Sequence, residues 1–419
     1  MYPEPFSFTV NALMVASYFG HIDTLLRLLS DPESQDPGSL EQALYWAARQ
    51  GRSGCVGVWL QQPQCDPQIS GLKSQVPLSA AAQFGHLECV TLLLKDVRLD
   101  IKAQDSRGRT ALSLTASNNH AEIASVLLAH YHIDVNLPNN SLNTPLHWAV
   151  AAGSYSIVSQ ILPDSCAHSG NLDKRGRNFL SWAVEYGATD IVSLPLHSRV
   201  VLVDQKDSRG RTPLSYASQH GHPPVVKQLV ESKLINPLDQ DYGGRNAHSW
   251  AATQRQSSVL RYLIKNCRQG ADVPDRDGWT PLLWALDPPG YVENMLLLFQ
   301  LGCVDVNRKD SIHGRTFLSW VTIYGYTQVA RQVVLLKDVE IEARDVNGRT
   351  PLSEATASGG VEIVRLLIET GKVDVDSRDK QGRTPLSWAV IEGHGEVVQL
   401  LLSIPAMDRE SRDSAGRTV

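Results

Sequence analysis

The amino-acid sequence predicts an all-α solenoid of about twelve helix-turn-helix units, and two observations carry this prediction. The first is a repeat. The stretch Gly-Arg-Thr-Pro-Leu-Ser around Thr350 returns 34 residues later around Thr384. The second is an apolar spacing of three and four residues within each unit, which is typical of one helix face. A fixed period of this length indicates units that stack on their neighbours. Equivalent positions are Asn11, Gln42, Val76, Thr110, Thr144, Asn178, Thr212, Asn246, Thr280, Thr316, Thr350, Thr384 and Thr418.

The first helix of the unit has clear start and stop signals. Thr384 is a good N-cap, because its hydroxyl accepts from a free backbone N–H. Pro385 follows at the first helical position, where no N–H is missed. Gly393 ends the helix in a left-handed conformation, which Asn119 also suits but Arg255 does not. The apolar face between the caps consists of Leu386, Ala389 and Val390.

The second helix and the connecting turn are equally regular. The apolar run Val397–Leu402 predicts the second helix of the twelfth repeat. Residues 373–379 return the chain to the next turn, which Asp379–Gly382 forms. Pro195 is expected to cut short the second helix of the sixth repeat, since a helix interior disfavours Pro. Pro223 stands at the start of a helix, where Pro is tolerated.

These motifs resemble an ankyrin repeat, with Ser where most ankyrin units carry His. His147 is the one residue that keeps the usual His. The tetratricopeptide repeat has the same length, but its Trp, Leu-Gly and Tyr pattern is missing here. The resemblance covers residues 11–419. It implies a short lead-in at 1–10, an array at 11–412 and the start of a truncated further repeat at 413–419. Units start near 11, 42, 76, 105, 139, 173, 207, 241, 275, 310, 345 and 379.

Composition excludes several classes of protein. The net charge is −5, which argues against a nucleic-acid partner. No run of eighteen apolar residues occurs, so no membrane span is expected. The N-terminus lacks the basic start and apolar core of a secretion signal. The six cysteines show no paired spacing, which indicates free thiols in a reducing compartment, the cytoplasm or the nucleus. They are Cys55, Cys65, Cys89, Cys166, Cys267 and Cys303. The chain is expected to be a monomer.

No catalytic, metal or cofactor site is expected. The sequence lacks a phosphate-binding Gly-rich loop, a Gly-x-Ser-x-Gly motif and a His-Glu-x-x-His motif. Two His-containing pairs, His130/His132 and Cys166/His168, have no third ligand at zinc spacing. Carboxylates are abundant, but they recur with the repeat, so they are expected to stabilise the fold of each unit rather than to catalyse a reaction.

The resemblance also implies where a protein partner would bind. In ankyrin arrays the turn tips and the two residues before the helix-ending Gly line the concave face, which usually binds. The candidate partner-binding residues are Phe84, Arg107, Arg109, Arg175, Tyr186, Arg209, Arg211, His220, Trp279, Tyr324, Arg349 and Arg383.

An Arg precedes the N-cap position in eight of the ten repeats from the fourth onward. This Arg column has two interpretations: a basic ladder for an acidic partner segment, or ion pairs with turn carboxylates such as Asp207 and Asp345. The carboxylates recur with the same period and the net charge is negative, which favours the ion pairs. Trp279 replaces the Arg in the ninth repeat, and Asn143 in the fifth.

An aromatic column stands four residues after the N-cap position, and packing between first helices is the favoured interpretation. Glu354 occupies the column in the eleventh repeat, so the column is expected to be partly open to solvent there. Tyr186 follows Trp182 at i+4, and Tyr324 follows Trp320 in the same way. These tyrosines are either binding anchors or shields of the column. The column contains Trp46, Trp148, Trp182, Tyr216, Trp250, Trp284, Trp320 and Trp388.

The Ser-Trp-Ala variant, the Lys-Val-Asp-Val-Asp-Ser-Arg-Asp loop and Gly-Arg-Thr resemble ankyrin arrays of filamentous fungi. The stretch 12–20 is similar to the first unit after the NTPase domain of fungal NACHT–ankyrin proteins, although this chain has no NACHT motif. The resemblance implies a non-catalytic protein-binding scaffold, as in the sensor part of a fungal immune or incompatibility receptor. The alternative is an adaptor that recruits a substrate to a ubiquitin ligase. No F-box-like or SOCS-box-like segment is visible, which weighs against it.

Overall fold

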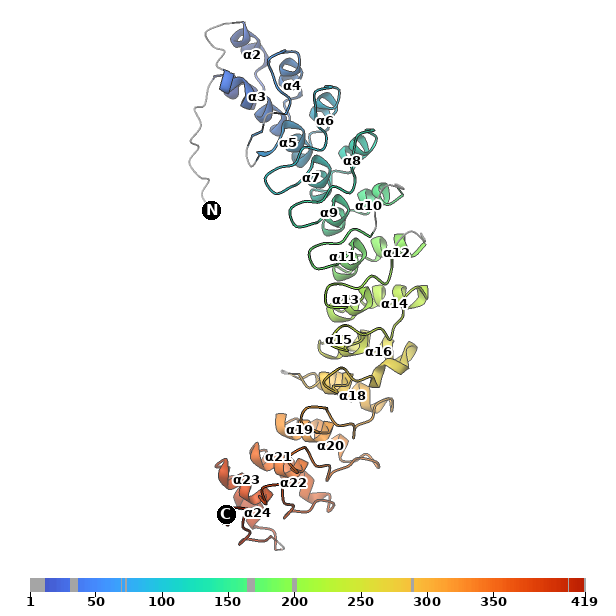
Figure 1. Ribbon diagram of the computed structural model, residues 1–419, viewed down its shortest axis with the longest axis vertical. Coiled ribbons are helices and arrows are strands. Elements are labelled where there is room, and N and C mark those ends of the chain that lie inside the picture. Colours follow the sequence, from blue (N-terminus) through green and yellow to red (C-terminus); the bar gives the residue numbers. More distant parts are fainter. Residues whose placement is uncertain are drawn as a thin grey trace. The chain divides into compact units, whose positions relative to one another are not determined.

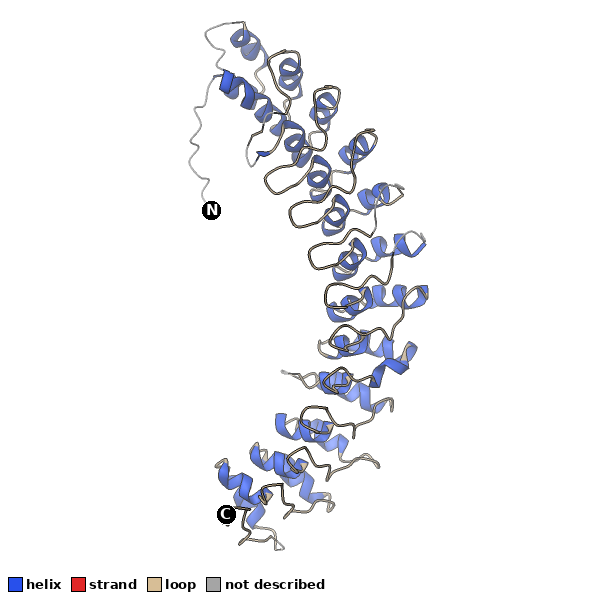
Figure 2. Cartoon of the chain, viewed as in Figure 1, coloured by secondary structure: helices blue, strands red, loops and turns tan. Residues whose placement is uncertain are grey.

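The computed structural model describes residues 12–30, 37–68, 70–71, 74–163, 170–197, 202–287, 290–405 and 407–417. Within these residues the chain forms 24 α-helices and a short 3₁₀ helix, η3 (Figure 2). Consecutive helices contact each other as twelve pairs, so the predicted all-α array of about twelve units is confirmed. None of the described helices is both long and apolar enough to cross a bilayer. Contacts divide the chain into an N-terminal part, Met1–Ser208, and a C-terminal part, Arg209–Val419.

In the N-terminal part the first helices of successive repeats pack in one row and the second helices in another (Figure 1). This arrangement buries the apolar face of each helix against the same face of the next repeat. The first helices are α1 (Ala12–Phe19), α3 (Pro37–Arg49), α5 (Pro77–Phe84), α7 (Ala111–Ser117), α9 (Pro145–Ala151) and α11 (Phe179–Glu185). The second helices are α2 (Ile22–Leu29), α4 (Ser53–Leu60), α6 (Leu87–Leu93), α8 (Ala121–Leu128), α10 (Tyr155–Ile161) and α12 (Thr189–His197).

The C-terminal part repeats this two-row arrangement. Its first helices are α13 (Pro213–His220), α15 (Ala247–Ala252), α17 (Pro281–Trp284), α19 (Phe317–Tyr324), α21 (Pro351–Ala357) and α23 (Pro385–Ile391). Its second helices are α14 (Pro223–Ser232), α16 (Ser257–Asn266), α18 (Val292–Gln300), α20 (Thr327–Val333), α22 (Val361–Glu369) and α24 (Gly395–Leu402). The 3₁₀ helix η3 (Arg268–Asp272) follows α16.

The predicted caps of the first helices are confirmed. The Thr384 hydroxyl accepts from the backbone N–H of Ser387. Gly393 has a φ of 77°, and Asn119, in the equivalent place, has a φ of 58°. Arg255 keeps a negative φ, and α15 before it is only six residues long. Arg255, unlike Asn119, therefore stays out of the left-handed region, where Asn is tolerated better than other residues with a Cβ.

Of the two proline predictions, one is confirmed and one is wrong. Pro223 is the first residue of α14, as expected. Pro195 does not end its helix, because α12 continues to His197. Pro195 has no N–H to donate to the carbonyl of Ile191, and the helix nevertheless continues for two residues beyond it.

Backbone hydrogen bonds join the turns of neighbouring repeats into what we call the turn ladder. In each step the residue after the turn Asp donates its N–H to a carbonyl in the preceding turn. The donors and acceptors are Asn140 to Arg107 and Ser208 to Arg175 in the N-terminal part. In the C-terminal part they are Tyr242 to Arg209, Arg276 to Gly243, Ser311 to Asp277, Val346 to His313, Lys380 to Asn347 and Ser414 to Gln381, at 2.8–3.0 Å.

The histidines after the helix-ending Gly make a second set of links between repeats. His86 Nε2 lies 3.0 Å from the carbonyl of Arg49, and His394 Nε2 lies 3.0 Å from that of Ala357. His120 makes the same contact with Gln83. A carbonyl only accepts, so Nε2 carries the proton in each case. These histidines connect one repeat to the open carbonyls at the end of the preceding first helix.

His248 is a buried histidine in a place where neighbouring repeats have Leu. Its side chain is fully buried in α15, and its ring packs against Gly270 of η3. Neither ring nitrogen makes a hydrogen bond of good geometry. Burial lowers the pKa of His248 to about 4, and the nearby carbonyls of Leu263 and Cys267 only partly offset this. His248 is therefore neutral in the folded chain near pH 7.

We predict that His248→Leu removes an acid sensitivity of the array. The folded pKa of about 4 lies below the usual 6.5, so neutral His248 favours folding fully above pH 6.5. That contribution, about 3 kcal/mol at most, is lost as the pH falls from 6.5 towards 4. Thermal unfolding between pH 4 and 7 should show a smaller loss of Tm for the variant. An identical pH profile in both proteins would contradict the assignment.

Candidate functional site

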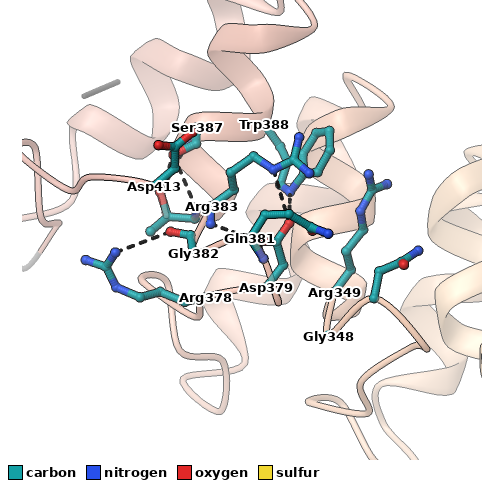
Figure 3. Close-up of polar contacts among 12 residues, drawn as sticks. Gly348, Arg349, Arg378, Asp379, Gln381, Gly382, Arg383, Ser387, Trp388 and Asp413 are labelled. Carbon is teal, nitrogen blue, oxygen red and sulfur yellow. Dashed lines mark hydrogen bonds and ion pairs between the residues drawn. The ribbon is translucent and has the colours of Figure 1, made fainter. Parts of the chain in front are cut away.

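The carboxylate of the turn Asp is the polar centre of the repeat. In the twelfth repeat Asp379 Oδ1 accepts the N–H groups of Gln381 and Arg383, at 2.8 and 2.9 Å (Figure 3). The other oxygen, Oδ2, accepts from the indole Nε1 of Trp388 at 3.1 Å. The same indole bond occurs in Asp173/Trp182, Asp241/Trp250, Asp275/Trp284 and Asp310/Trp320.

The interpretation of the aromatic column as packing alone does not include this hydrogen bond. The signal was present, because Asp and Trp keep a spacing of nine residues in four of these five repeats. A buried indole N–H requires an acceptor. The column therefore ties the first helix to its own turn as well as packing against its neighbours.

The Arg column is engaged inside the chain, which supports the ion-pair interpretation. Arg109 lies 2.8 Å from Asp105, and Arg177 lies 2.9 Å from Asp173 in the same turn. Other members stack on rings of the aromatic column. The guanidinium carbon of Arg349 lies 3.7 Å from the ring centroid of Trp388, which belongs to the next repeat. Figure 3 shows Arg349 and Arg383 beside Trp388. Such cations contribute electrostatically to the ring stack.

Two turn carboxylates show what the Arg column does electrostatically. Burial alone would raise the pKa of Asp173, but the N–H of Arg177, the Trp182 indole and the Arg177 guanidinium outweigh it, and the pKa is lowered. Asp275 has Trp279 in place of the Arg, and burial raises its pKa. The column cation is therefore one of the groups that lower the pKa of the turn carboxylate, after the backbone N–H and the indole.

Glu354 is buried, which contradicts the expectation that the aromatic column opens to solvent in the eleventh repeat. Only 4% of the residue is exposed. Its carboxylate lies 2.6 Å from Arg315 of the preceding repeat and 3.5 Å from Arg349 of its own. Because both guanidinium groups are already placed by the Arg column, the acid is neutralised where Trp stands elsewhere. Asp345 Oδ2, the oxygen that would accept a Trp indole, has no hydrogen-bond partner.

The fifth repeat departs from the pattern because Asn139 replaces the turn Asp. Its Oδ1 accepts the N–H groups of Ser141 and Asn143. The rest of the amide is an NH₂ group, which donates rather than accepts. The indole Nε1 of Trp148 is accordingly buried without a hydrogen-bond partner.

The ninth and tenth repeats bring together an extended aromatic cluster. The ring centroid of Trp279 lies 5.0 Å from that of Trp284 and 5.6 Å from that of Trp320. Trp320 stacks on Tyr324 at 5.7 Å with an interplanar angle of 18°. Tyr324 is 37% exposed, and the neighbouring turn residue Ile312 is also exposed. Trp279 thus takes the stacking role of the column Arg and adds apolar surface.

Predicted site residues of the N-terminal part lie at separate places. Tyr186 is 56% exposed, and its ring centroid lies 6.3 Å from that of Trp182 in an edge-on arrangement. Phe84 is exposed and lies beneath the guanidinium of Arg49, at 4.3 Å. Arg107 and Arg175 are exposed at turn tips. The two predicted Trp–Tyr pairs therefore touch, but their geometries differ.

The remaining predicted residues lie on the same row of turns and first helices in the C-terminal part. Arg209 is exposed, whereas Arg211 is half-buried and lies over the Tyr216 ring at 4.4 Å. His220 is exposed at the end of α13 and stacks on the same Tyr216 ring. Arg383 is half-buried against Trp388.

The described residues contain no group of three or more His, Cys, Asp or Glu side chains placed to hold a metal ion. His130 and His132 lie in an exposed loop with their rings beside Tyr131. The pair Cys166/His168 lies outside the described residues. The described cysteines, namely Cys55, Cys65, Cys89, Cys267 and Cys303, are free thiols.

Comparison with protein families agrees with the repeat geometry. The family model described as "Ankyrin repeats (3 copies)" matches residues 13–105, 78–170, 153–241 and 318–413, which is most of the chain. No curated protein sequence matches the chain.

We predict that Trp388→Phe and Trp148→Phe differ in cost, although both keep an apolar ring. The first leaves Asp379 Oδ2 without its indole donor, which should cost about 1–3 kcal/mol. The second removes an N–H that has no acceptor, so its cost should be smaller. Urea unfolding of both variants measures the difference. Equal costs would show that the indole bond does not contribute.

We predict that Glu354→Ala destabilises the array by about 3 kcal/mol, because Arg315 then loses its shorter ion pair and keeps only Asp345, 3.7 Å away. Glu354→Trp should cost less. The new indole can donate to Asp345 Oδ2, which accepts no hydrogen bond, and stack under Arg349, as Trp388 does. The free energy of unfolding of the two variants tests this. A larger loss for the Trp variant would overturn the account of the column.

Proposed function

Because the chain belongs to the ankyrin-repeat family, we propose that it is a non-catalytic scaffold that binds a protein partner through its first helices and turn tips. Repeats of this kind present a long surface whose backbone is fixed by stacking, while the tip residues vary from repeat to repeat. A rigid surface loses little conformational entropy on binding, which favours a tight complex.

The aromatic cluster of Trp279, Trp320 and Tyr324 is the observation that carries this proposal. Eight of the ten repeats from the fourth onward have an Arg in the place of Trp279, so structure alone does not require an aromatic ring there. The substitution removes the cation of its own turn from Asp275, whose pKa burial raises, and leaves Arg245 of the preceding repeat as the positive charge that acts on it. Tyr324 is exposed and stacks on the buried Trp320, and a tyrosine with an exposed ring and a polar tip is typical of binding hot spots.

The arginines divide into two groups that support different roles. Arg109, Arg349 and Arg383 are engaged with carboxylates or rings, and we propose that they position the surface rather than contact a partner. Arg107 and Arg175 project from the tips, where they are accessible. Phe84 and Tyr186 in the N-terminal part, and Arg209, Arg211 and His220 in the C-terminal part, are further proposed contacts at turn tips and at the ends of first helices.

We further propose that the chain is a monomeric sensor array of the fungal NACHT–ankyrin type and that it acts in the cytoplasm or nucleus. The resemblance of the Ser-Trp-Ala and Gly-Arg-Thr motifs supports the first point, and five free thiols support a reducing compartment. No observation favours the ubiquitin-ligase adaptor. Affinity purification from a fungal lysate discriminates, since ligase subunits should co-purify only with an adaptor.

We predict that Tyr324→Ala weakens binding of a purified partner by about 2 kcal/mol or more while Tm changes little. Tyr186→Ala tests the second pair in the same way. Isothermal titration calorimetry measures affinity, and circular dichroism measures Tm. Tyr186 is 56% and Tyr324 is 37% exposed, so part of each ring is free to contact a partner.

Tyr131→Ala is the matched control, because Tyr131 is an exposed tyrosine in the loop after a second helix. It should leave both affinity and Tm unchanged. If Tyr324→Ala lowers Tm by several degrees and leaves the affinity unchanged, the tyrosine shields the column and the proposed site is wrong.

A further inference from the structure

The turn of the fifth repeat has a strained residue at its tip. Leu142 stands where every other described turn from Asp105 onward has Gly, and its φ is 64°. A bulky residue in this left-handed region is a backbone outlier. Leu142 is also 47% exposed, so burial of its side chain does not offset the strain.

The Cβ of Leu142 interferes with the turn ladder. A Cβ built on Gly108 would lie 2.8 Å from the backbone nitrogen of Asn140, and one on Gly176 would lie 2.9 Å from that of Ser208. These two nitrogens donate the ladder bonds of their steps. A side chain at the turn Gly position is therefore incompatible with the ladder bond to the next repeat.

The ladder is interrupted at this step, as the clash requires. The equivalent bond would run from the N–H of Lys174 to the carbonyl of Ser141. It is the one step between Asp105 and Asp413 for which the described residues show no such bond. Both residues are exposed. The tip of the fifth repeat thus presents an open backbone donor and an open acceptor next to an exposed Leu.

Unpaired cations flank this open tip. Arg107, Lys174 and Arg175 are exposed in the turns on either side, and none of them forms an ion pair with a described residue. In the same turns Arg109 and Arg177 are paired with Asp105 and Asp173. The turn of the fifth repeat, residues 139–143, contains no charge at all. The turn tips therefore have an excess of positive charge around the exposed apolar side chain of Leu142.

We propose that the turn of the fifth repeat docks an extended, acidic protein segment that carries an apolar side chain. The segment's backbone would bond the Lys174 N–H and the Ser141 carbonyl, as a strand does at an open edge. Its apolar side chain would contact Leu142, and its carboxylates would lie against Arg107, Lys174 and Arg175. Strained residues that persist without a structural benefit occur at ligand-binding sites. This inference rests on the proposed protein-binding function and assigns its partner class at this turn.

A protein segment fits these groups better than a nucleic acid. Single-stranded nucleic acids bind on aromatic platforms and along basic grooves. The tip instead offers an aliphatic side chain and one backbone donor–acceptor pair, on a chain of net charge −5.

The decisive variant is Leu142→Gly, which should stabilise the protein and weaken binding at once. Removal of the strain and of the Cβ should raise Tm by about 2 °C. It should also restore the ladder bond, so hydrogen exchange at the Lys174 amide should slow towards that at Ser208. The probe is a fluorescein-labelled Glu-Asp-Glu-Leu-Glu-Asp-Glu peptide, whose affinity measured by anisotropy should fall about tenfold.

Lys233→Gly is the matched control for strain. Lys233 is an exposed residue with a φ of 58° at the end of α14, away from the turn tips. This variant should gain stability in the same way and leave peptide affinity unchanged. If both glycine variants bind the peptide as the unaltered chain does, the proposal is wrong.

The role of charge is tested with the double variant Arg107→Glu/Arg175→Glu, because neither arginine makes an ion pair with a described residue. The control is Arg276→Glu, which changes an exposed residue at the turn tip of the ninth repeat. The double variant should abolish peptide binding, and the control should not. A peptide with Ser in place of Leu, or with Lys in place of the acids, should bind at least tenfold more weakly.

Preferential binding of an oligo(dT) twenty-mer that depends on Arg107 and Arg175 would overturn the choice of an acidic segment. So would the absence of peptide binding by the unaltered chain. In that case a partner captured through Tyr324 would leave the general protein-binding function standing, because the two surfaces lie in different repeats.

Discussion

The buried carboxylate of the turn Asp is the constraint on which the repeats from the fourth onward depend, with Asn139 as the one replacement. In the sixth repeat Asp173 satisfies two backbone N–H groups, a guanidinium and an indole at the same time. A buried carboxylate is costly unless it is fully hydrogen-bonded, so the turn has one conformation available. That conformation directs the next N–H towards the preceding turn and fixes where the first helix begins. The Arg and aromatic columns are best understood as partners of this acid.

Repeating features of the fold could be predicted, because each repeat provided an independent observation of the same physical requirement. The N-cap, the first-turn Pro and the left-handed helix end all followed from single-residue preferences. Pro195 misled because a proline was expected to end its helix, whereas α12 continues to His197 without the hydrogen bond that Pro195 cannot donate. Glu354 misled because an acid in an apolar column was taken as a sign of water. Its burial depends on two arginines, one of them in another repeat.

The candidate site was predictable only as a row of positions. The family register indicates which residues occupy the turn tips and the ends of first helices, but not which side chains are free. Arg107 and Arg109 are two positions apart in one turn, yet only Arg109 forms an ion pair with Asp105. The effect of Leu142 on the turn ladder could not be predicted from the sequence for the same reason. Its replacement of Gly is visible in the sequence, whereas its clash involves the backbone of the following turn.

The interrupted step beside Leu142 has a mechanical consequence. A stack of repeats transmits tension through the links between neighbours, and it yields first where a link is missing. Between the fifth and sixth repeats no hydrogen bond joins Ser141 to Lys174, so the load falls on the packed helices and on the bonds His147–Arg177 and Asn171–Asn136. This junction therefore lacks a link that the junctions before and after it have, at Asn140 and Ser208. A molecule that hydrogen-bonds both the Ser141 carbonyl and the Lys174 N–H would stiffen the array locally.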